Sequence, residues 1–364
     1  MLNPELLSPA HAEHACFFRT KKQVSLALPA VPGPIAESHT HLTSLRHIDA
    51  ALALARAAVA GVRFLVTVVD PADDARDPEA VLADLDRWQR ECAEILDAWC
   101  AAGVLDALGE PPVMPEVRLL VGCHPHNAKD FDAQAHEAMQ RLLAEPICCG
   151  VGEIGLDYHY DLSPREVQRE VFREQLELAC SLNASLSLHV REAHDEAAQI
   201  MGEAGLPREG GVVLHCFDLG PEDAAPFLEM GCVLGIGGAV SFKRNDPTRD
   251  AVAALRPGRL VLETDAPYMA PEPLRGTQCE PAYIARTAEF VADLRRERCG
   301  DEPADTYRDA YELARRIFDR PAPLAGARGE GRGRAQQGYG HAPHCRACGQ
   351  PPQERRVCPL CRRA

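Results

Sequence analysis

Eight short apolar runs that alternate with stretches of helical spacing dominate the pattern of this 364-residue chain. Short, near-continuous apolar strands separated by helices indicate a parallel sheet that is covered on both faces. The chain is long enough for the ~250 residues that eight such units need, so we predict an α/β fold with a (β/α)8 TIM-type barrel. The predicted strands lie within 34–42, 63–70, 117–126, 148–157, 185–192, 211–218, 232–238 and 259–267.

Residues with metal-binding or catalytic chemistry gather at the ends of these runs. In a barrel the C-terminal ends of the strands converge on one face, which is where barrel active sites lie. Taken alone, each placement has an ordinary explanation, such as a hydrogen-bonded core histidine or a helix N-cap. The repetition over six predicted strands instead favours one shared site, formed by His39, His41, His124, Glu153, His189, His215 and Asp265.

The chemistry of this set points to metal ions. His39 and His41 are two positions apart, so on a strand their side chains point the same way. Four imidazoles and two carboxylates are too many ligands for one tetrahedral ion, but they suit two cations that share a bridging carboxylate. Paired ions acidify a bridging water and stabilise both oxygens of a displacement at phosphorus. The residues alone therefore predict metal-assisted hydrolysis.

The charge of the chain constrains how it could bind a phosphate-bearing substrate. The formal net charge is -15, and from Arg320 onward nine Arg stand against Glu330 and Glu354. That segment therefore carries +7, which leaves -22 on the residues before it. Affinity for nucleic acid comes from cationic contacts to phosphate, so the main part of the chain needs a local attractor, which divalent metal ions supply.

Several features predict a cytoplasmic protein with no membrane association. No run of about 18 apolar residues occurs, and the first residues lack a basic segment followed by an uninterrupted apolar one. Most of the 15 cysteines stand singly in apolar segments, where a thiol behaves as a small hydrophobe. This usage favours a reducing compartment over a disulfide framework.

Six separated motifs resemble those of the TatD metal-dependent hydrolases. They occur in the family order between residue 35 and about residue 318, and they read ESHTHL, GCHPH, GEIGLDY, HVRE, HCF and LETDAPY. The resemblance implies a TIM-type barrel of the amidohydrolase superfamily with a deoxyribonuclease activity supported by Mg, Mn or Zn, often a 3′ to 5′ exonuclease. It also implies a set of metal ligands, with His39, His41 and Asp265 on the first ion, Glu153 as the bridge, and His189 and His215 on the second.

The resemblance assigns further roles near the metals. Asp265 would also act as general base and take a proton from the attacking water. His124 would contact the scissile phosphate, unless its role is structural. Arg191, two residues beyond His189, would bind phosphate or form an ordinary ion pair with a carboxylate. Glu263 would support a metal ligand through a hydrogen bond.

The chain departs from the family pattern at two places. Glu37 replaces the Asp that usually precedes SHTH, and its longer arm would shift a supporting contact or add a ligand. Gln278 and Cys279 replace the usual Arg-Asn before Glu-Pro, which removes a cation and an amide from the expected site mouth. These changes put substrate preference in doubt more than catalysis.

The end of the chain has a different composition. Residues 320–344 are rich in Gly, Ala, Pro and Arg, which predicts a flexible linker. Two C-x-x-C pairs separated by nine residues follow, and they suit one structural Zn held by four thiolates in a small ribbon, on which the ribbon's folding would depend. These ligands are Cys345, Cys348, Cys358 and Cys361.

We therefore predict four segments. They are an N-terminal arm of unknown purpose over 1–33, the hydrolase barrel over 34–319, the linker over 320–344 and the zinc ribbon over 345–364. Arginines around the ribbon would contact nucleic acid through phosphate or a protein partner, or would simply be solvated.

Two rival functions remain from the sequence. One is an amidohydrolase acting on a small amide, ester or lactone, because the same barrel serves carbon centres. Many such enzymes bridge their metals with a modified Lys at the end of the fourth strand, where this chain has Glu153, and this favours a phosphodiesterase. The other rival is a non-enzymatic scaffold that docks through the ribbon, which would be expected if the metal ligands were broken.

Overall fold

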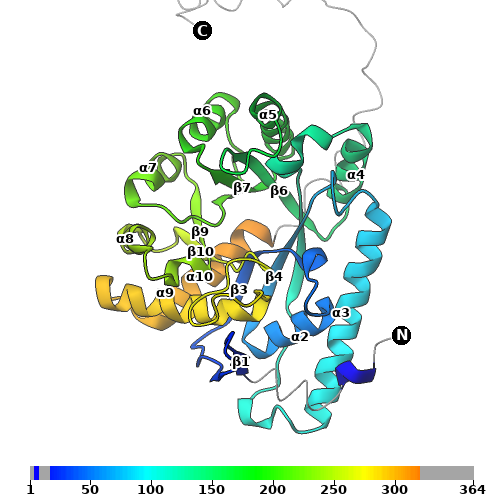
Figure 1. Ribbon diagram of the computed structural model, residues 1–364, viewed down its shortest axis with the longest axis vertical. Coiled ribbons are helices and arrows are strands. Elements are labelled where there is room, and N and C mark those ends of the chain that lie inside the picture. The colour runs from blue at the N-terminus through cyan, green and yellow to red at the C-terminus, as the bar shows by residue number, and fades with distance from the viewer. Residues whose placement is uncertain (1–3, 8–16, 320–364) are drawn as a thin grey trace, which may run out of the picture. The chain divides into compact units, whose positions relative to one another are not determined.

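The computed structural model describes residues 4–7 and 17–319, and these contain the predicted barrel (Figure 1). Eight parallel strands run in chain order around the sheet, each paired with the next one along the chain. All eight predicted runs contain a strand. The strands are β3 (Ile35–Thr40), β4 (Val62–Val69), β5 (Glu116–Val121), β6 (Cys148–Asp157), β7 (Ser185–Arg191), β8 (Val212–Leu214), β9 (Val233–Ile236) and β10 (Leu260–Leu262).

The first and last strands meet through hydrogen bonds at and beyond their ends. The Ser38 hydroxyl donates to the Leu262 carbonyl at 2.9 Å, within the span of both strands. Further along, the Asp265 N–H donates to the His39 carbonyl at 3.0 Å and the His41 N–H donates to the Ala266 carbonyl at 2.9 Å. These contacts bring the segment that follows β10 against the histidines of β3.

Side chains of the strands alternate between the barrel interior and the surrounding helices, as the two-residue period of a strand requires. On β4, Phe64, Val66 and Val68 belong to an inner apolar cluster that also receives side chains from β5, β8, β9 and β10. Leu65 and Val69 belong to the larger cluster formed with the helices. Both faces of the sheet are apolar, which explains why the runs in the sequence are nearly continuous.

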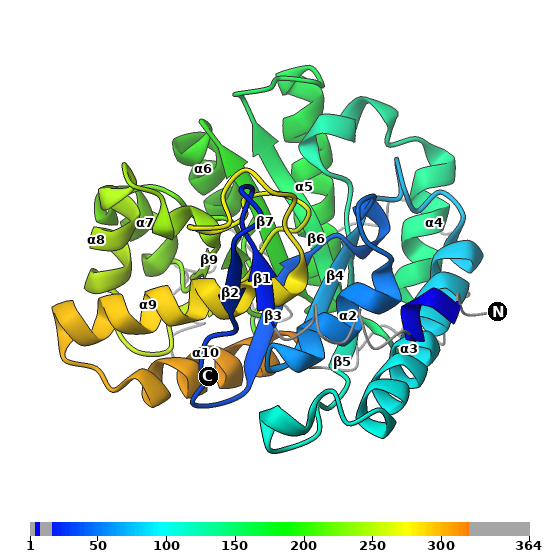
Figure 2. The same ribbon diagram turned by 60° about the horizontal axis from the view of Figure 1, so that its bottom comes forward.

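Each strand is followed by a helix that packs on the outside of the barrel (Figure 2). Several helices begin where the sequence supplies a cap: Asp49, Asp77 and Asp132 accept hydrogen bonds from N–H groups of the first turn of α2, α3 and α4. The helices are α2 (Ala50–Val59), α3 (Pro78–Ala101), α4 (Ala133–Leu143), α5 (Arg165–Leu182), α6 (His194–Ala204), α7 (Pro221–Glu229), α8 (Asp246–Ala254), α9 (Ile284–Cys299) and α10 (Pro303–Phe318).

The last helix closes one end of the barrel. Leu313, Ile317 and Phe318 of α10 are buried in the inner cluster with the strand side chains. The Ser185 hydroxyl at the start of β7 donates to the Ile317 carbonyl at 2.6 Å. Because α10 covers the end where the strands begin, the opposite end, where the strands finish, is left for a site.

The N-terminal arm contains structure that the sequence pattern did not predict. β1 (Phe17–Arg19) and β2 (Ser25–Ala27) form an antiparallel hairpin, and a 3-10 helix spans Pro4–Leu7. The Phe18 ring is fully buried and makes an edge-on contact with the Tyr283 ring, with ring centroids 5.0 Å apart. The hairpin therefore packs on the segment that begins α9.

Two further observations concern the predictions on compartment and tail. Among the described residues no helix is long and apolar enough to cross a membrane. The ten cysteines between residues 17 and 319 are all free thiols. The predicted linker and zinc ribbon lie outside the described residues.

Candidate metal centre

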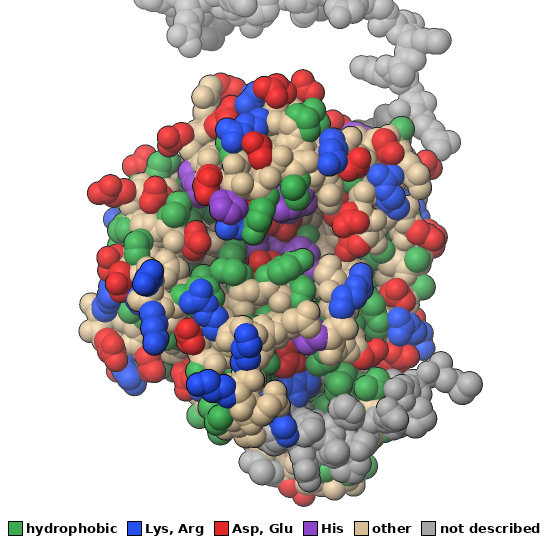
Figure 3. Space-filling model, in the orientation of Figure 1, with side chains coloured by type: hydrophobic (Ala, Val, Ile, Leu, Met, Phe, Trp, Pro, Cys, Tyr) green, Lys and Arg blue, Asp and Glu red, His purple; other side chains and the backbone are tan. Residues whose placement is uncertain are grey.

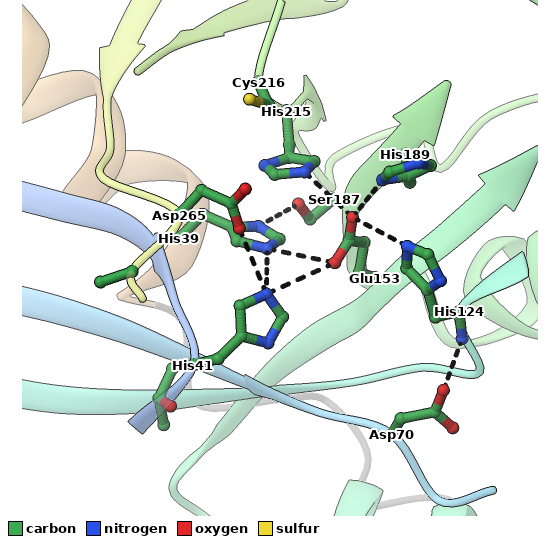
Figure 4. A network of polar contacts seen from close by, with 12 residues as sticks. His39, His41, Asp70, His124, Glu153, Ser187, His189, His215, Cys216 and Asp265 are labelled. Carbon is green, nitrogen blue, oxygen red and sulfur yellow. Dashed lines mark hydrogen bonds and ion pairs between the residues drawn. The ribbon is translucent and has the colours of Figure 1, made fainter. Parts of the chain in front are cut away.

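One buried carboxylate lies at the centre of the predicted site (Figure 4). Glu153 of β6 is 4% exposed, and its two oxygens face different groups of side chains. Its Oε2 is 3.3 Å from His39 Nε2 and 3.7 Å from His41 Nε2. Asp265 Oδ1 lies 3.4 Å from the same His41 nitrogen. We call His39, His41 and Asp265 the Oε2 side of the site.

The other oxygen of Glu153 faces three more histidines. Its Oε1 is 2.6 Å from His189 Nδ1 and 2.9 Å from His215 Nε2. His124 Nε2 lies 3.6 Å from the same oxygen. We call His124, His189 and His215 the Oε1 side. The structure thus brings all seven residues of the predicted site together around Glu153.

The strands place these side chains in slightly different ways from the predicted one. His39 and His189 lie within β3 and β7, close to their C-terminal ends, whereas His124 and Asp265 come three residues after a strand ends. The prediction that Glu153 stands at a strand end is wrong. β6 continues for four residues beyond it, because the ladder with β7 extends as far as the pairing of Asp157 with Arg191.

A second ring of polar groups holds the histidines in orientation. His39 Nδ1 is 3.0 Å from the Ser187 hydroxyl, and His189 Nε2 is 3.1 Å from Asp157 Oδ2. His215 Nδ1 lies within ion-pair distance of Glu263 Oε1, at 3.3 Å, but the two atoms do not form the hydrogen bond predicted for Glu263. Such contacts fix which ring nitrogen is free to bind a metal ion.

Asp157 is a site residue that the sequence reasoning missed. It is fully buried, and its Oδ2 is also 2.8 Å from His126 Nε2. Its Oδ1 accepts hydrogen bonds from the His159 and Tyr160 N–H groups at 2.9 and 2.8 Å. A signal was available, because Asp157 is four residues after Glu153 on one strand, and an even spacing puts two side chains on the same face.

The histidines and the central carboxylate shift each other's protonation. Burial acts to raise the pKa of Glu153, but the charges of His215, His124 and the other neighbouring histidines hold it well below its usual range. Burial, and then the charge of His215, lower the pKa of His39. Burial also acts to lower the pKa of His189, but the Glu153 charge and the hydrogen bond to Asp157 leave it raised. The central carboxylate is therefore ionised and available as a ligand.

Glu37, one of the two departures from the family pattern, lies behind the site rather than in it. Its Oε1 accepts hydrogen bonds from the His39 and Thr264 N–H groups at 3.1 and 3.0 Å. Burial raises its pKa well above the usual range. Among the described residues Glu37 belongs to none of the groups with metal-ligand geometry, so the structure favours a supporting contact over an added ligand.

In the other departure, Cys279 is fully buried and so does not lie at the site mouth, whereas its neighbour Gln278 is exposed. Burial, and then the Glu37 carboxylate, raise the pKa of its thiol well above the ordinary value. Cys279 and Glu37 therefore lie near one another, and Glu37 contacts His39 of the Oε2 side.

The donor atoms fit divalent metal ions. Imidazole nitrogens combined with carboxylate oxygens suit Zn and Mn, and carboxylates also suit Mg. Within each of four groups among the described residues, one donor atom per residue lies within 4.8 Å of the others. The groups are His39, His41 and Glu153; Glu153, His189 and His215; His39, His215 and Asp265; and His124, His126 and His189.

Arg191 stands at the rim of the site. Its side chain is exposed, and its guanidinium carbon lies 4.9 Å from the centre of the Tyr160 ring. None of the ion pairs found among residues 17–319 involves Arg191, so the ordinary ion pair considered above is not formed. The guanidinium donors remain available to a substrate.

The barrel and its paired carboxylate and histidine groups define a metal-dependent hydrolase of the TIM-barrel class. The family TatD related DNase matches residues 36–319, and the chain belongs to this family. It is 31% identical over 268 residues to the uncharacterized metal-dependent hydrolase TatD of Mycobacterium tuberculosis, covering 71% of this chain and 90% of that protein. It is 34% identical over 206 residues to the 3′-5′ ssDNA/RNA exonuclease TatD of Erwinia billingiae, covering 55% of this chain and 77% of that protein.

Solved structures show the same fold. A TatD homologue from Escherichia coli K12, YJJV, superposes with a TM-score of 0.63 at 26% identity, covering 79% of this chain and 98% of that one. A mutant of a PTE-like lactonase from Deinococcus radiodurans superposes with a TM-score of 0.52 at 14% identity, covering 82% of this chain and 99% of that one. At that identity the second likeness concerns the fold alone.

Proposed function

We propose that this protein hydrolyses phosphodiester bonds in DNA, as a metal-dependent deoxyribonuclease of the 3′ to 5′ exonuclease type. The observation that carries the proposal is Glu153, whose two oxygens face two separate sets of metal-ligand donors. A buried carboxylate shared in this way suits a pair of divalent ions, which would neutralise a phosphodiester and activate water when bound. The relatives named as 3′-5′ ssDNA/RNA exonucleases support a nucleic-acid substrate.

The proposal assigns the metal ligands by side. The ions would be two Mg, Mn or Zn, with Glu153 shared between them. A carboxylate bridge also distinguishes the site from those barrel hydrolases of small amides, esters or lactones that use a modified Lys in the fourth strand. The Oε2 side would contribute His39, His41 and Asp265, and the Oε1 side would contribute His189 and His215.

Asp265 is the proposed general base. Burial acts to raise its pKa, but the hydrogen bond from His41 and the charge of His215 keep it lowered, so the carboxylate is ionised. Its side chain is 15% exposed, in contrast to the fully buried His39, so it borders the space that a substrate would enter. An ionised carboxylate at this border can accept a proton from the attacking water.

His124 is the proposed phosphate contact, and its hydrogen bonds define the form in which it acts. Burial lowers its pKa to about 4, so the ring is neutral at pH 7. Its Nδ1 accepts the His126 N–H at 3.1 Å, which places the single ring proton on Nε2. His124 would therefore donate this proton in a hydrogen bond to a phosphate oxygen, without contributing a full positive charge. Arg191 at the rim would supply that charge.

The experiment that tests the proposal is cleavage of end-labelled single-stranded DNA by metal-stripped protein resupplied with Mg, Mn or Zn. Stepwise shortening that requires metal, and that disappears in Asp265→Asn, is the expected result. A properly metallated protein that leaves DNA and RNA intact but hydrolyses a small lactone or amide would replace the proposal with the amidohydrolase alternative. Metal binding without any hydrolysis would favour the scaffold.

The zinc ribbon, its contacts and the cytoplasmic location stay predictions. A structural Zn on the four C-terminal cysteines predicts that Cys345→Ser combined with Cys348→Ser lowers the Zn content of the full chain by one ion. Elemental analysis of both proteins checks this, and equal Zn content would contradict it.

A further inference from the structure

Two exposed tyrosines stand at the end of the barrel that holds the site. Eight large hydrophobic side chains are exposed among the described residues, and Tyr160 and Tyr268 are the two aromatic ones, 54% and 58% exposed. Both lie in loops beside site residues: Tyr160 follows β6, which carries Glu153, and Tyr268 follows β10 in the same loop as Asp265. Figure 3 shows hydrophobic side chains beside the histidines that are visible in a central hollow of this face.

Each tyrosine is fixed to one side of the metal centre. The Tyr268 N–H donates to the Asp265 carbonyl at 2.8 Å, and its ring is edge-on to His41 with centroids 6.4 Å apart. Tyr268 therefore lies on the Oε2 side. The backbone hydrogen bond fixes the position of the Tyr268 backbone beside Asp265, from which the exposed ring extends.

Tyr160 occupies the corresponding position on the Oε1 side. Its N–H donates to Asp157 Oδ1 at 2.8 Å, and the other oxygen of Asp157 contacts His189. Its ring is edge-on to His126 with centroids 5.5 Å apart. In both loops the tyrosine comes three residues after an aspartate of the site and its N–H donates to that residue, to the carboxylate of Asp157 in one loop and to the backbone carbonyl of Asp265 in the other.

From this placement we propose that Tyr160 and Tyr268 are stacking platforms for two nucleobases, one on each side of the bound phosphodiester. The inference rests on the proposed function and adds to it the two residues that would receive unpaired bases. In a duplex the bases are stacked on each other and paired, whereas unpaired bases present their faces to aromatic side chains. Stacking does not read the edge of a base, so cleavage depends on the presence of bases and only weakly on their sequence.

The positive charge of Arg191 at the rim of the site suits a nucleotide as the ligand. Arg191 lies against the Tyr160 ring, yet more than half of Tyr160 remains exposed with the guanidinium in place. A planar cation beside an aromatic ring suits a nucleotide, whose phosphate pairs with the guanidinium while its base stacks. An apolar ligand would not use this cation.

The test compares oligonucleotides that differ only in their bases. One substrate is single-stranded oligothymidylate, and the other carries tetrahydrofuran in place of the base on its two 3′-terminal nucleotides. Tyr160→Ala and Tyr268→Ala are each expected to lower kcat/KM on the first substrate about tenfold, as loss of one stacked base implies. On the second substrate their kcat/KM should equal that of the wild type. Tyr160→Phe and Tyr268→Phe keep the ring and should retain activity on both.

Val113→Ala is the matched control, because Val113 is 60% exposed and precedes β5 at the other end of the barrel. Melting temperatures within a few degrees of wild type show that each variant folds. Unchanged kcat/KM in both Ala variants, or equal losses on the two substrates, would overturn the stacking role while leaving the nuclease proposal intact.

Binding separates the two proposals further. Fluorescence anisotropy of labelled oligothymidylate with metallated protein should show that base removal and Tyr→Ala weaken binding without adding together. A wild-type protein that cleaves nothing but shows this pattern would refute the nuclease and keep the platforms. Equal affinity of the wild type for base-bearing and base-less strands would refute the platforms.

Discussion

The two sides of Glu153 present similar donors but are supported by different chemistry. On the Oε2 side, His39 is backed by a neutral hydroxyl, that of Ser187. On the Oε1 side, His189 and His215 are backed by the buried carboxylates of Asp157 and Glu263. A carboxylate behind a histidine raises the basicity of the ring and strengthens it as a metal ligand.

The pKa shifts of the histidines differ within each side as well as between the sides. Burial lowers the pKa of His39, whereas Glu153 and Glu263 overcome burial and raise the pKa of His215 well above its ordinary value. Burial acts to lower the pKa of His41, but the hydrogen bond with Asp265 leaves it raised, and burial lowers the pKa of His124 to about 4. The expected difference between the sides therefore rests on the carboxylates behind His189 and His215, on the Oε1 side. We expect the ion on that side to bind more tightly and the ion on the Oε2 side to exchange more readily.

The largest effect on cleavage is expected at Glu153, the residue that the two sides share. Glu153→Gln removes the negative charge that both sides share, so it should lower the rate of DNA cleavage to about one-thousandth of wild type or less. The same variant should bind fewer than two ions per chain, as measured by elemental analysis after dialysis. The side chain keeps its size, so the fold should survive, and circular dichroism checks this.

Retained metal-dependent cleavage in folded Glu153→Gln would sink the assignment of this residue as the bridge. Loss of activity with both ions still bound would instead show that the charge is needed for the reaction rather than for holding metal. Glu166→Gln, an exposed glutamate on α5, is a control for the removal of one charge at a distance.

A second variant is expected to weaken metal binding on the Oε1 side alone. Asp157→Asn replaces an acceptor of two ring nitrogens by a neutral amide, so the support behind His189 is weakened. Loss of such a partner typically lowers metal affinity about 10- to 100-fold. Isothermal titration of the metal-free protein should show the tighter of two binding steps weakened and the other nearly unchanged.

Asp161→Asn is the matched control for Asp157→Asn, because it makes the same chemical change on an exposed residue of the loop that follows β6. If the weaker step changed while the tighter one did not, the ranking of the two sides would be reversed. If neither step changed, Asp157 would have only a structural role, as the anchor of the loop that carries Tyr160.

The fold was largely predictable from the sequence because both faces of the sheet are covered. That burial makes each strand a nearly continuous apolar run, such as Val62–Val69, and separates it clearly from the amphipathic helices. The N-terminal hairpin could not be predicted in this way. Its strands are three residues long, and the burial of Phe18 depends on Tyr283, which is distant in the sequence.

The centre of the site was predictable for a related reason. Histidines and carboxylates in the C-terminal half of a strand or just after it, such as Glu153 and Asp265, must meet in a barrel, whatever the details of the loops. The residues that support the histidines could not be predicted in this way. A Ser such as Ser187 is common in a strand, and its contact with His39 joins β3 to β7, which are distant in the sequence. Likewise, nothing in the sequence shows that the Arg191 guanidinium lies on Tyr160.

Ser187→Ala tests the weaker support on the Oε2 side. Removing one neutral hydrogen bond to His39 typically costs about 1 kcal/mol, which corresponds to about a fivefold loss of affinity. We expect the weaker of the two metal-binding steps to fall by this factor in the titration used for Asp157→Asn. An effect as large as that of Asp157→Asn would show that the two sides do not differ in the strength of their support.

The last prediction concerns stability, with little effect expected on cleavage, and it tests how His124, the third histidine of the Oε1 side, is held. Asp70 Oδ2 accepts a hydrogen bond from the backbone N–H of His124 at 3.0 Å. Burial raises the pKa of Asp70 to about 6. Since this folded-state pKa is above the ordinary unfolded value of about 3.9, the folded state binds the extra proton between these pH values. The contribution of Asp70 to stability is therefore fully present below about pH 4 and declines as pH rises to about 6.

Asp70→Asn cannot ionise and should lack this dependence. In urea denaturation with a chelator present, lowering the pH from 7 to 4.5 should stabilise the wild type relative to Asp70→Asn by about 2 kcal/mol. Asp86→Asn on the exposed face of α3 controls for the general effect of removing a negative charge. A difference between wild type and Asp70→Asn that stays constant with pH, or that grows as pH rises, would mean that the carboxylate holding His124 is ionised throughout. Asp70 would then stay charged below pH 6 as well, where we expect it to be protonated, and its contribution to the Oε1 side would not depend on pH over this range.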